Sequence, residues 1–133
     1  KTMNLDTKKT YDSAVDNLIV GIGNNFDKWN NVDYSDNEVL DSDNKRMREI
    51  KKASAVRFKK NLYVKPGRKF DKVIHDNSVW GFVAKADGML KGIPYFVGDV
   101  FKAASWAAPA KHVRGSIFAT EQNWFAWTGP NYL

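Results

Sequence analysis

Lysine and arginine are concentrated in one stretch of this chain. The formal net charge is +6, yet residues 1–44 sum to −5, residues 45–72 to +10 and residues 73–133 to +1. Closely spaced cations bind phosphates, and each phosphate that they neutralise releases counterions. Residues 45–72 therefore predict a contact surface for a polyanion, with nucleic acid as the first class of partner.

The most accessible phosphate contacts are expected where the basic stretch turns. Residues 62–64 and 70–74 have strand composition and flank Lys65-Pro-Gly-Arg-Lys69, which is typical of a hairpin. The predicted phosphate contacts are Arg57, Lys59, Lys60, Lys65, Arg68, Lys69 and Lys72. The alternative interpretation is a solvated helix face whose charge is neutralised by the acidic residues of the first third of the chain.

Aromatic residues form a second set of candidate binding residues, because unpaired bases stack on aromatic rings that lie beside cations. The set is Trp80, Phe82, Tyr95, Phe96, Phe101, Trp106, Trp124, Phe125, Trp127 and Tyr132. Most of these side chains are expected in the core, because neighbours on a strand face opposite sides and a small domain needs large apolar groups. Trp106, Trp124 and Trp127 are the candidates for an exposed platform, and the binding prediction includes Trp106 and Trp124.

A third candidate is a phosphate site at Lys111, His112 and Arg114. These residues follow a predicted strand and a run of alanines, whose small side chains permit close approach of a backbone. The alternative is a tight connection with three exposed polar side chains.

Catalytic signatures are not found. The chain has no cysteine, which excludes thiol chemistry, disulfides and Cys-based zinc sites. It has two histidines, His75 and His112, without metal-ligand spacing, and no nucleophile elbow or glycine-rich phosphate loop. The sequence therefore favours a non-enzymatic function and predicts neither a metal nor a cofactor.

Two helices are predicted to come first in the chain. Tyr11, Val15, Leu18, Ile22, Phe26 and Trp29 recur at helical spacing. Thr10 and Asp12 are candidate caps near its start. Gly21 and Gly23 either lie inside the helix, at a cost of about 1 kcal/mol each, or end it early, near Val20. A loop over 30–44 leads to a basic helix over 45–60, in which Met47, Ile50, Ser54 and Phe58 share one face.

Strand patterns dominate after residue 61. They cover residues 62–64, 70–74, 78–84, 93–97, 99–102, 116–119 and 124–127, with a turn at Asp87-Gly88. Helices followed by strands predict a single α+β domain over 1–133, with a mostly antiparallel sheet of about five or six short strands. No apolar run is long enough to span a bilayer and no signal core is seen, so a cytoplasmic protein is expected.

Part of the sequence resembles a group of small uncharacterised bacteriophage proteins. The resemblance rests on Ser78-Val-Trp-Gly-Phe-Val83, residues 98–118 and Trp127-Thr-Gly-Pro130, and covers residues 62–133. It implies a phage origin, with the host cytoplasm as the location, and transfers no function and no site residue.

We therefore expect a nucleic-acid-binding phage accessory or early protein that contacts single-stranded DNA or RNA rather than a specific duplex. Its binding is either independent of sequence, through cations on phosphates and one or two aromatic platforms, or directed to structured RNA through shape and charge. One alternative is an inhibitor or interaction module that docks on a host protein or defence factor, with the acidic first third as its surface. A further alternative is a small enzyme or nucleotide-binding protein built around His112 and Arg114.

Overall fold

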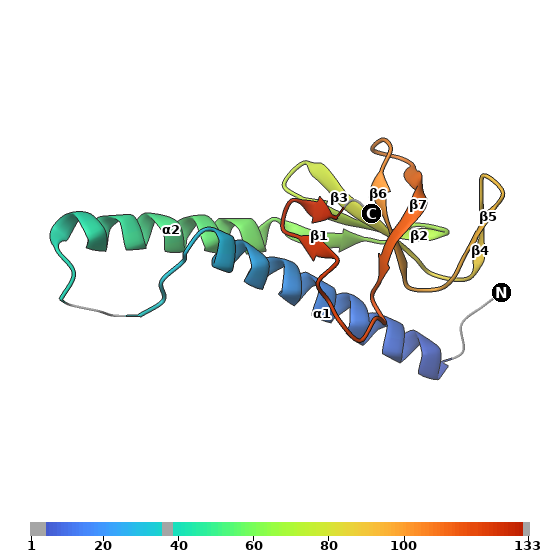
Figure 1. The fold of residues 1–133 in the computed structure, drawn as a ribbon, viewed down its shortest axis with the longest axis horizontal. Helices are drawn as coiled ribbons and strands as arrows, with labels where there is room; N and C mark the ends of the chain where they lie inside the picture. Colours follow the sequence, from blue (N-terminus) through green and yellow to red (C-terminus); the bar gives the residue numbers. More distant parts are fainter. Residues whose placement is uncertain (1–4, 36–38, 132–133) are drawn as a thin grey trace.

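The computed structural model describes residues 5–35 and 39–131 and shows two helices followed by strands (Figure 1). The α+β prediction is thereby confirmed. The elements are α1 (Leu5–Trp29), α2 (Ser42–Lys60), β1 (Leu62–Lys65), β2 (Phe70–His75), β3 (Ser78–Ala84), β4 (Gly88–Leu90), β5 (Ile93–Tyr95), β6 (Asp99–Ala103), β7 (Pro109–Ser116), β8 (Phe125–Ala126) and β9 (Gly129–Pro130).

The main sheet has five antiparallel strands in the order β1-β2-β3-β6-β7, and β4–β5 and β8–β9 form separate two-stranded sheets. Neighbouring residues of β3 face opposite sides of the main sheet. Val83 belongs to the core cluster that includes the buried row of α1, on what we call the inner face, whereas Phe82 joins Tyr95 of β5 on the outer face. The sheet therefore has a helix-covered side and a side that is covered in part by the β4–β5 hairpin.

Helix α1 begins earlier than predicted and does not end early at its two glycines. It begins at Leu5, before the expected caps, and continues through Gly21 and Gly23 to Trp29. Tertiary packing explains this: the space over Gly21 is occupied by the Phe125 ring, so the contact offsets the roughly 1 kcal/mol that a helical glycine costs. The predicted apolar row is buried from Tyr11 to Phe26, but Trp29 is 69% exposed.

Helix α2 is capped by Asp41, whose carboxylate accepts a hydrogen bond of 2.8 Å from the Asn44 backbone. Its predicted apolar face is buried only near the C-terminus, at Phe58. Met47 and Ile50 are about half exposed, because the N-terminal half of α2 extends beyond the sheet (Figure 1). The prediction of a helix is confirmed, but the prediction that Met47 and Ile50 lie on a buried face is wrong.

The strands agree with the predictions over 62–84 and differ near residue 110. Strand β7 covers Pro109–Ser116, where a turn was expected, and residues 117–119 are not in a strand. The turn that reverses the chain lies earlier, with the backbone amides of Ala104 and Ser105 donating to the Ala108 carbonyl. Small residues supply this tight reversal, so β6 and β7 become a hairpin.

The short β4–β5 hairpin was also misread. Gly88 begins β4, and the reversal lies at Lys91 and Gly92, which both have positive φ (51° and 80°). Two successive positive φ values are typical of a type I′ hairpin turn. The predicted strand over 124–127 is confirmed as the shorter β8, which pairs with β9.

Candidate functional site

A cleft lies between the β1–β2 hairpin and the turn that precedes β7, and we call it the hairpin cleft. Its volume is ≈ 430 Å³. The residues that line it come from the hairpin tip, from β2 and β3 below it, and from the turn before β7: Lys65, Pro66, Gly67, Arg68, Lys69, Phe70, Lys72, Phe82, Ala107 and Pro109. The cleft thus joins two segments about 40 residues apart in sequence.

Four cations surround the hairpin cleft. Lys65, Arg68 and Lys69 are exposed at the tip, and Lys72 is half-buried on β2 opposite Lys65. None of the ten described residues that line the cleft is acidic. A partner that carries negative charge would therefore meet cations here without a competing carboxylate in the lining.

The floor of the cleft is aromatic. Phe82 is buried and meets Phe70 edge to face, with ring centroids 6.2 Å apart. The Lys72 ammonium lies 5.7 Å from the centre of the Phe82 ring and 4.5 Å from the centre of the Trp106 ring. Trp106 is 50% exposed. Cation–π contacts at these distances hold Lys72 between the floor and an indole that is open to solvent.

The shape of the hairpin is fixed from behind by Asp71. This carboxylate is 8% exposed, and it accepts hydrogen bonds from the Tyr11 hydroxyl (2.9 Å) and from the Gly67 backbone (3.4 Å). Lys85 lies 3.6 Å from Asp71 and donates to the Gly67 carbonyl at 2.9 Å. A side chain at Gly67 would collide with the Phe70 carbonyl oxygen, so the tip requires glycine.

Tyr11 links this hairpin anchor to α1. Burial, together with the adjacent Asp71 carboxylate, raises the pKa of the Tyr11 phenol far above its ordinary value. The phenol therefore stays protonated and keeps donating to Asp71. The hairpin tip is positioned by a buried polar contact to a residue 60 positions away in sequence.

The cations of α2 are placed differently. Arg57 and Lys60 are exposed, but the Lys59 ammonium lies 2.7 Å from Asp27 and 3.1 Å from the Tyr34 hydroxyl. Partial burial lowers the pKa of Lys59, and the hydrogen bonds to these two groups outweigh it and raise the pKa. Lys59 is thus paired with the acidic first third of the chain.

A second carboxylate of that first third lies near α2. A hydrogen bond from Ser35 lowers the pKa of Asp33, and the nearby charges of Arg48 and Lys52 lower it further. Carboxylates of the first third of the chain therefore offset part of the charge of α2, whereas none of the described residues that line the hairpin cleft is acidic.

Trp124 and Trp127 lie away from the hairpin cleft. Both are partly buried against the inner core cluster, where Trp124 meets Trp80 (6.4 Å between ring centroids) and Trp127 meets Phe26 (5.0 Å). They were expected on opposite sides of a strand, but β8 is too short to impose that alternation. Tyr132 is outside the described residues.

Lys111, His112 and Arg114 all belong to β7. The first two are exposed and Arg114 is half-buried, and register shifts interrupt the pairing of β6 with β7. They do not line the hairpin cleft. The phosphate site predicted for these three residues stays a prediction and is not part of the site defined above.

Sequence reasoning found the cations of the cleft but missed their anchor. Asp71 is an isolated acid in a basic stretch, which was the available signal, but its partners Tyr11 and Lys85 are remote in sequence. Within residues 5–35 and 39–131, no three acidic or histidine side chains are grouped so that they could hold a metal ion. Neither described helix has the length and apolar character required to cross a membrane.

Comparison with known proteins places the chain in a family. Residues 31–132 match the model of a family of unknown function, DUF7717, and the chain belongs to that family. No curated protein and no solved structure matches the chain. The hairpin cleft lies wholly inside the matched residues, whereas α1 precedes them.

Proposed function

We propose that this member of the family is a binding protein for single-stranded nucleic acid, DNA or RNA, and that the hairpin cleft is its contact site. The observation that carries the proposal is the grouping of four cations around an aromatic floor, with no acidic residue among the ten that line the cleft. Phosphate contacts supply affinity, and aromatic rings accept unpaired bases.

The two chemical functions are divided between the two sides of the cleft. Lys65, Arg68 and Lys69 are exposed on the hairpin and contact consecutive phosphates. Trp106, which precedes the lining residue Ala107 and is half exposed, stacks against a base, and Lys72 beside it adds a cation to the stacked pair. A paired base in a duplex is not free to stack on a side chain in this way, which favours single strands.

The hairpin anchor supports affinity by keeping the tip ordered before binding. Asp71 and Lys85 hold the backbone of Gly67 from both its amide and its carbonyl. Ordering a flexible loop on binding costs free energy, so a loop that is already held loses less.

A protein partner is the second candidate, in line with the alternative of a phage inhibitor that docks on a host protein. It is favoured by Met47, Ile50 and Val56 of α2, which are half exposed or more. Apolar side chains on a projecting helix are typical of interaction surfaces. The phage origin itself remains a proposal from the sequence resemblance.

The test is fluorescence anisotropy with labelled single-stranded DNA, single-stranded RNA and duplex DNA at two salt concentrations. The variant Lys65→Gln/Arg68→Gln/Lys69→Gln removes three phosphate contacts, and its matched control Arg46→Gln/Arg57→Gln/Lys60→Gln removes three exposed cations from α2. For single strands, the hairpin variant should reduce the slope of log K against log[salt] by about 2, and lower affinity about 100-fold near 0.1 M salt.

The α2 control should change the slope less than the hairpin variant. Binding that is absent at physiological salt, or that does not depend on salt, would exclude the proposal and favour the protein-partner alternative. Loss of binding only in the α2 control would move the interface to that helix.

A further inference from the structure

A second cavity lies on the opposite side of the sheet from the hairpin cleft, between the C-terminal half of α1 and the segment that contains β8 and β9. Its volume is ≈ 560 Å³. We call it the amide pocket, because carboxamides from both segments line it: Asn24, Asn25, Gln122, Asn123 and Asn131. Two aromatic side chains, Trp29 and Phe125, also line the pocket.

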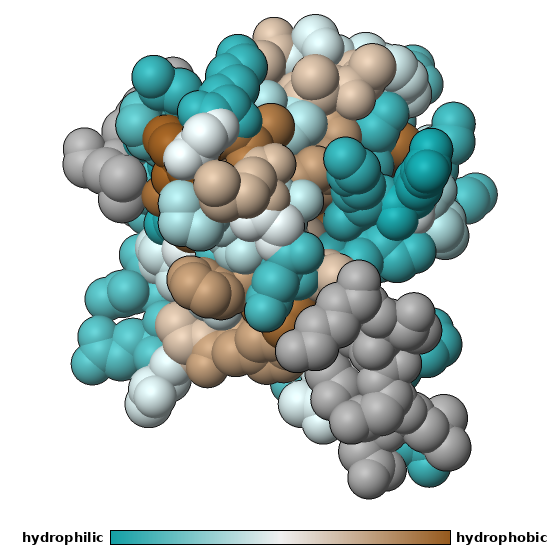
Figure 2. All heavy atoms as spheres, turned by 90° about the vertical axis from the view of Figure 1, so that its right-hand side faces the viewer, coloured by the Kyte–Doolittle hydropathy of each residue, from teal (hydrophilic) through white to brown (hydrophobic). Residues whose placement is uncertain are grey.

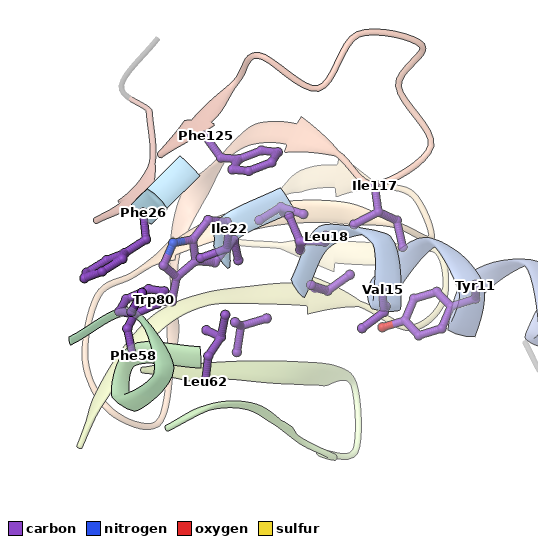
Figure 3. Close-up of a cluster of buried hydrophobic side chains, with 14 residues drawn as sticks. Tyr11, Val15, Leu18, Ile22, Phe26, Phe58, Leu62, Trp80, Ile117 and Phe125 are labelled. Carbon is purple, nitrogen blue, oxygen red and sulfur yellow. The ribbon is translucent and has the colours of Figure 1, made fainter. Parts of the chain in front are cut away.

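The floor of the amide pocket is built by close packing of β8 on α1. Phe125 lies over Gly21, where a Cβ atom would be only 2.9 Å from the ring. Figure 3 shows the Phe125 ring between β8 and α1. The contact explains a glycine in the middle of a long helix and gives the pocket an apolar base.

Three of the carboxamides are held in fixed orientations by the backbone. The side-chain oxygen of Asn25 accepts a hydrogen bond of 2.9 Å from the Trp127 amide. Its NH₂ group is then the part that can donate to a ligand. Asn131 donates to the Asn123 carbonyl (3.3 Å), and Gln122 donates to the Ala119 carbonyl (2.6 Å). In both residues the side-chain oxygen is then the group that can accept a hydrogen bond from a ligand. The pocket therefore presents both donors and acceptors that are already oriented.

The pocket is nearly neutral. Of the ten described residues that line it, only Lys28 carries a charge. An anionic polymer such as nucleic acid finds one cation here, compared with four at the hairpin cleft. The lining fits a ligand that is polar, uncharged and rich in groups that both donate and accept hydrogen bonds.

An exposed indole stands at the edge of this polar lining. Trp29 follows the buried apolar row of α1 by helical spacing, yet it is 69% exposed. The face of an aromatic ring is electronegative and attracts the weakly positive C–H groups of a flat apolar surface. The hydroxyl-bearing ring of a saccharide has such a C–H face together with donor and acceptor hydroxyls.

We propose that the amide pocket binds a neutral saccharide, whose ring stacks on Trp29 and whose hydroxyls bond the NH₂ of Asn25 and the side-chain oxygens of Gln122 and Asn131. This site does not depend on nucleic-acid binding at the hairpin cleft, because it uses different residues on the other side of the sheet.

The test is a titration of the full chain that is monitored by ¹H–¹⁵N NMR. The ligands are glucose, galactose, N-acetylglucosamine and the disaccharide formed by two units of each sugar. The five tryptophans give separate indole N–H signals, and Trp29→Ala assigns the signal of Trp29 by its loss. We expect at least one of these saccharides to shift the Trp29 indole and Asn25 amide signals at millimolar concentrations. Trp29→Ala should weaken binding about tenfold or more.

Two further variants make the result specific. Asn25→Asp keeps the acceptor for the Trp127 amide but removes the NH₂ donor, so it should fold normally and bind the saccharide more weakly. Trp106→Ala should leave saccharide binding unchanged, and Trp29→Ala should leave any nucleic-acid binding unchanged.

Three outcomes would overturn the assignment. One is that no saccharide of the panel shifts the Trp29 and Asn25 signals. Another is that binding persists unchanged in both Trp29→Ala and Asn25→Asp. The third is that uncharged nucleosides shift these signals while the saccharides do not, which would assign the pocket to a nucleobase.

Discussion

The β1–β2 hairpin and helix α2 are both basic and adjoin in the sequence, yet the fold treats their charges differently. On α2, Lys59 pairs with Asp27, and Asp33 lies near Arg48 and Lys52. On the hairpin, Asp71 is buried and bonds Tyr11, so its carboxylate is not part of the lining of the hairpin cleft. A run of cations in a sequence therefore does not define a binding surface until the positions of the nearby carboxylates are known.

The largest effect in this comparison is expected from the hairpin anchor. Asp71→Ala leaves the Tyr11 hydroxyl and the Lys85 ammonium without their buried partner, and should lower the free energy of unfolding by about 3 kcal/mol. Chemical denaturation measures this change. The matched change on α2, Glu49→Ala, removes an exposed carboxylate that lies 3.5 Å from Arg48 and 3.6 Å from Lys52, and should cost about 1 kcal/mol or less. Equal effects of the two changes would contradict the role of Asp71 as an anchor.

A somewhat smaller effect is expected from the exposed indole of the cleft. Trp106→Ala should weaken single-strand binding by about 1–3 kcal/mol and leave the free energy of unfolding nearly unchanged, because the side chain is half exposed. Anisotropy and denaturation measure the two quantities. Trp124→Ala is the control: it should destabilise the fold, since Trp124 packs in the inner cluster, without a separate effect on binding. A destabilised Trp106→Ala that binds normally would exclude the stacking role.

Tyr11 gives a pH-dependent effect of intermediate size. Because the pKa of its phenol is raised in the folded state, the unfolded chain loses this proton first, so the contribution of Tyr11 to folding stability should be constant below about pH 10 and fall as the pH rises above it. Tyr11→Phe should cost about 1 kcal/mol at neutral pH and remove that part of the alkaline decline. Denaturation curves at several alkaline pH values measure both. An unchanged decline in Tyr11→Phe would assign the pH dependence to other groups.

The smallest effect concerns the pairing on α2. Asp27→Asn removes the carboxylate that neutralises Lys59 and leaves its hydrogen bond to Tyr34, so it should strengthen binding of single strands slightly, by about 0.2–1 kcal/mol, if α2 lies near the bound polymer. The measurement is the same anisotropy titration at low salt. Combining the hairpin variant with Asp27→Asn shows whether the increase in affinity comes from α2 or requires the hairpin cations. A gain larger than the loss caused by the hairpin variant would reverse the ranking of the two regions.

The fold class and the first half of the elements followed from local patterns in the sequence. The apolar row of α1, the hairpin after Lys65 and the strand at 78–84 were predicted with nearly the observed bounds. The errors fell where tertiary contacts override local preference. Gly21 continues a helix because Phe125 packs on it, and Met47 is exposed because α2 extends past the sheet.

The candidate site was predicted only in part, for the same reason. Composition identified its cations, and the aromatic set included Phe82 and Trp106. The juxtaposition of the hairpin with the turn before β7 depends on the pairing of four strands, which no local pattern contains. The amide pocket was not predicted at all, because its two walls are contributed by opposite ends of the chain.

The hydrogen bond from the Trp127 amide to Asn25 spans 102 residues and has a consequence for biosynthesis. Helix α1 is translated before the strands on which its apolar side packs, and β8 follows all five strands of the main sheet in the sequence. Until then the nascent chain exposes a helix with a row of large apolar side chains, which is a state that chaperones recognise and that invites aggregation. Non-local contacts of this kind also slow folding. The native core can therefore close only after β8 and β9 have left the ribosome, which is later than the emergence of α1 or of any strand of the main sheet.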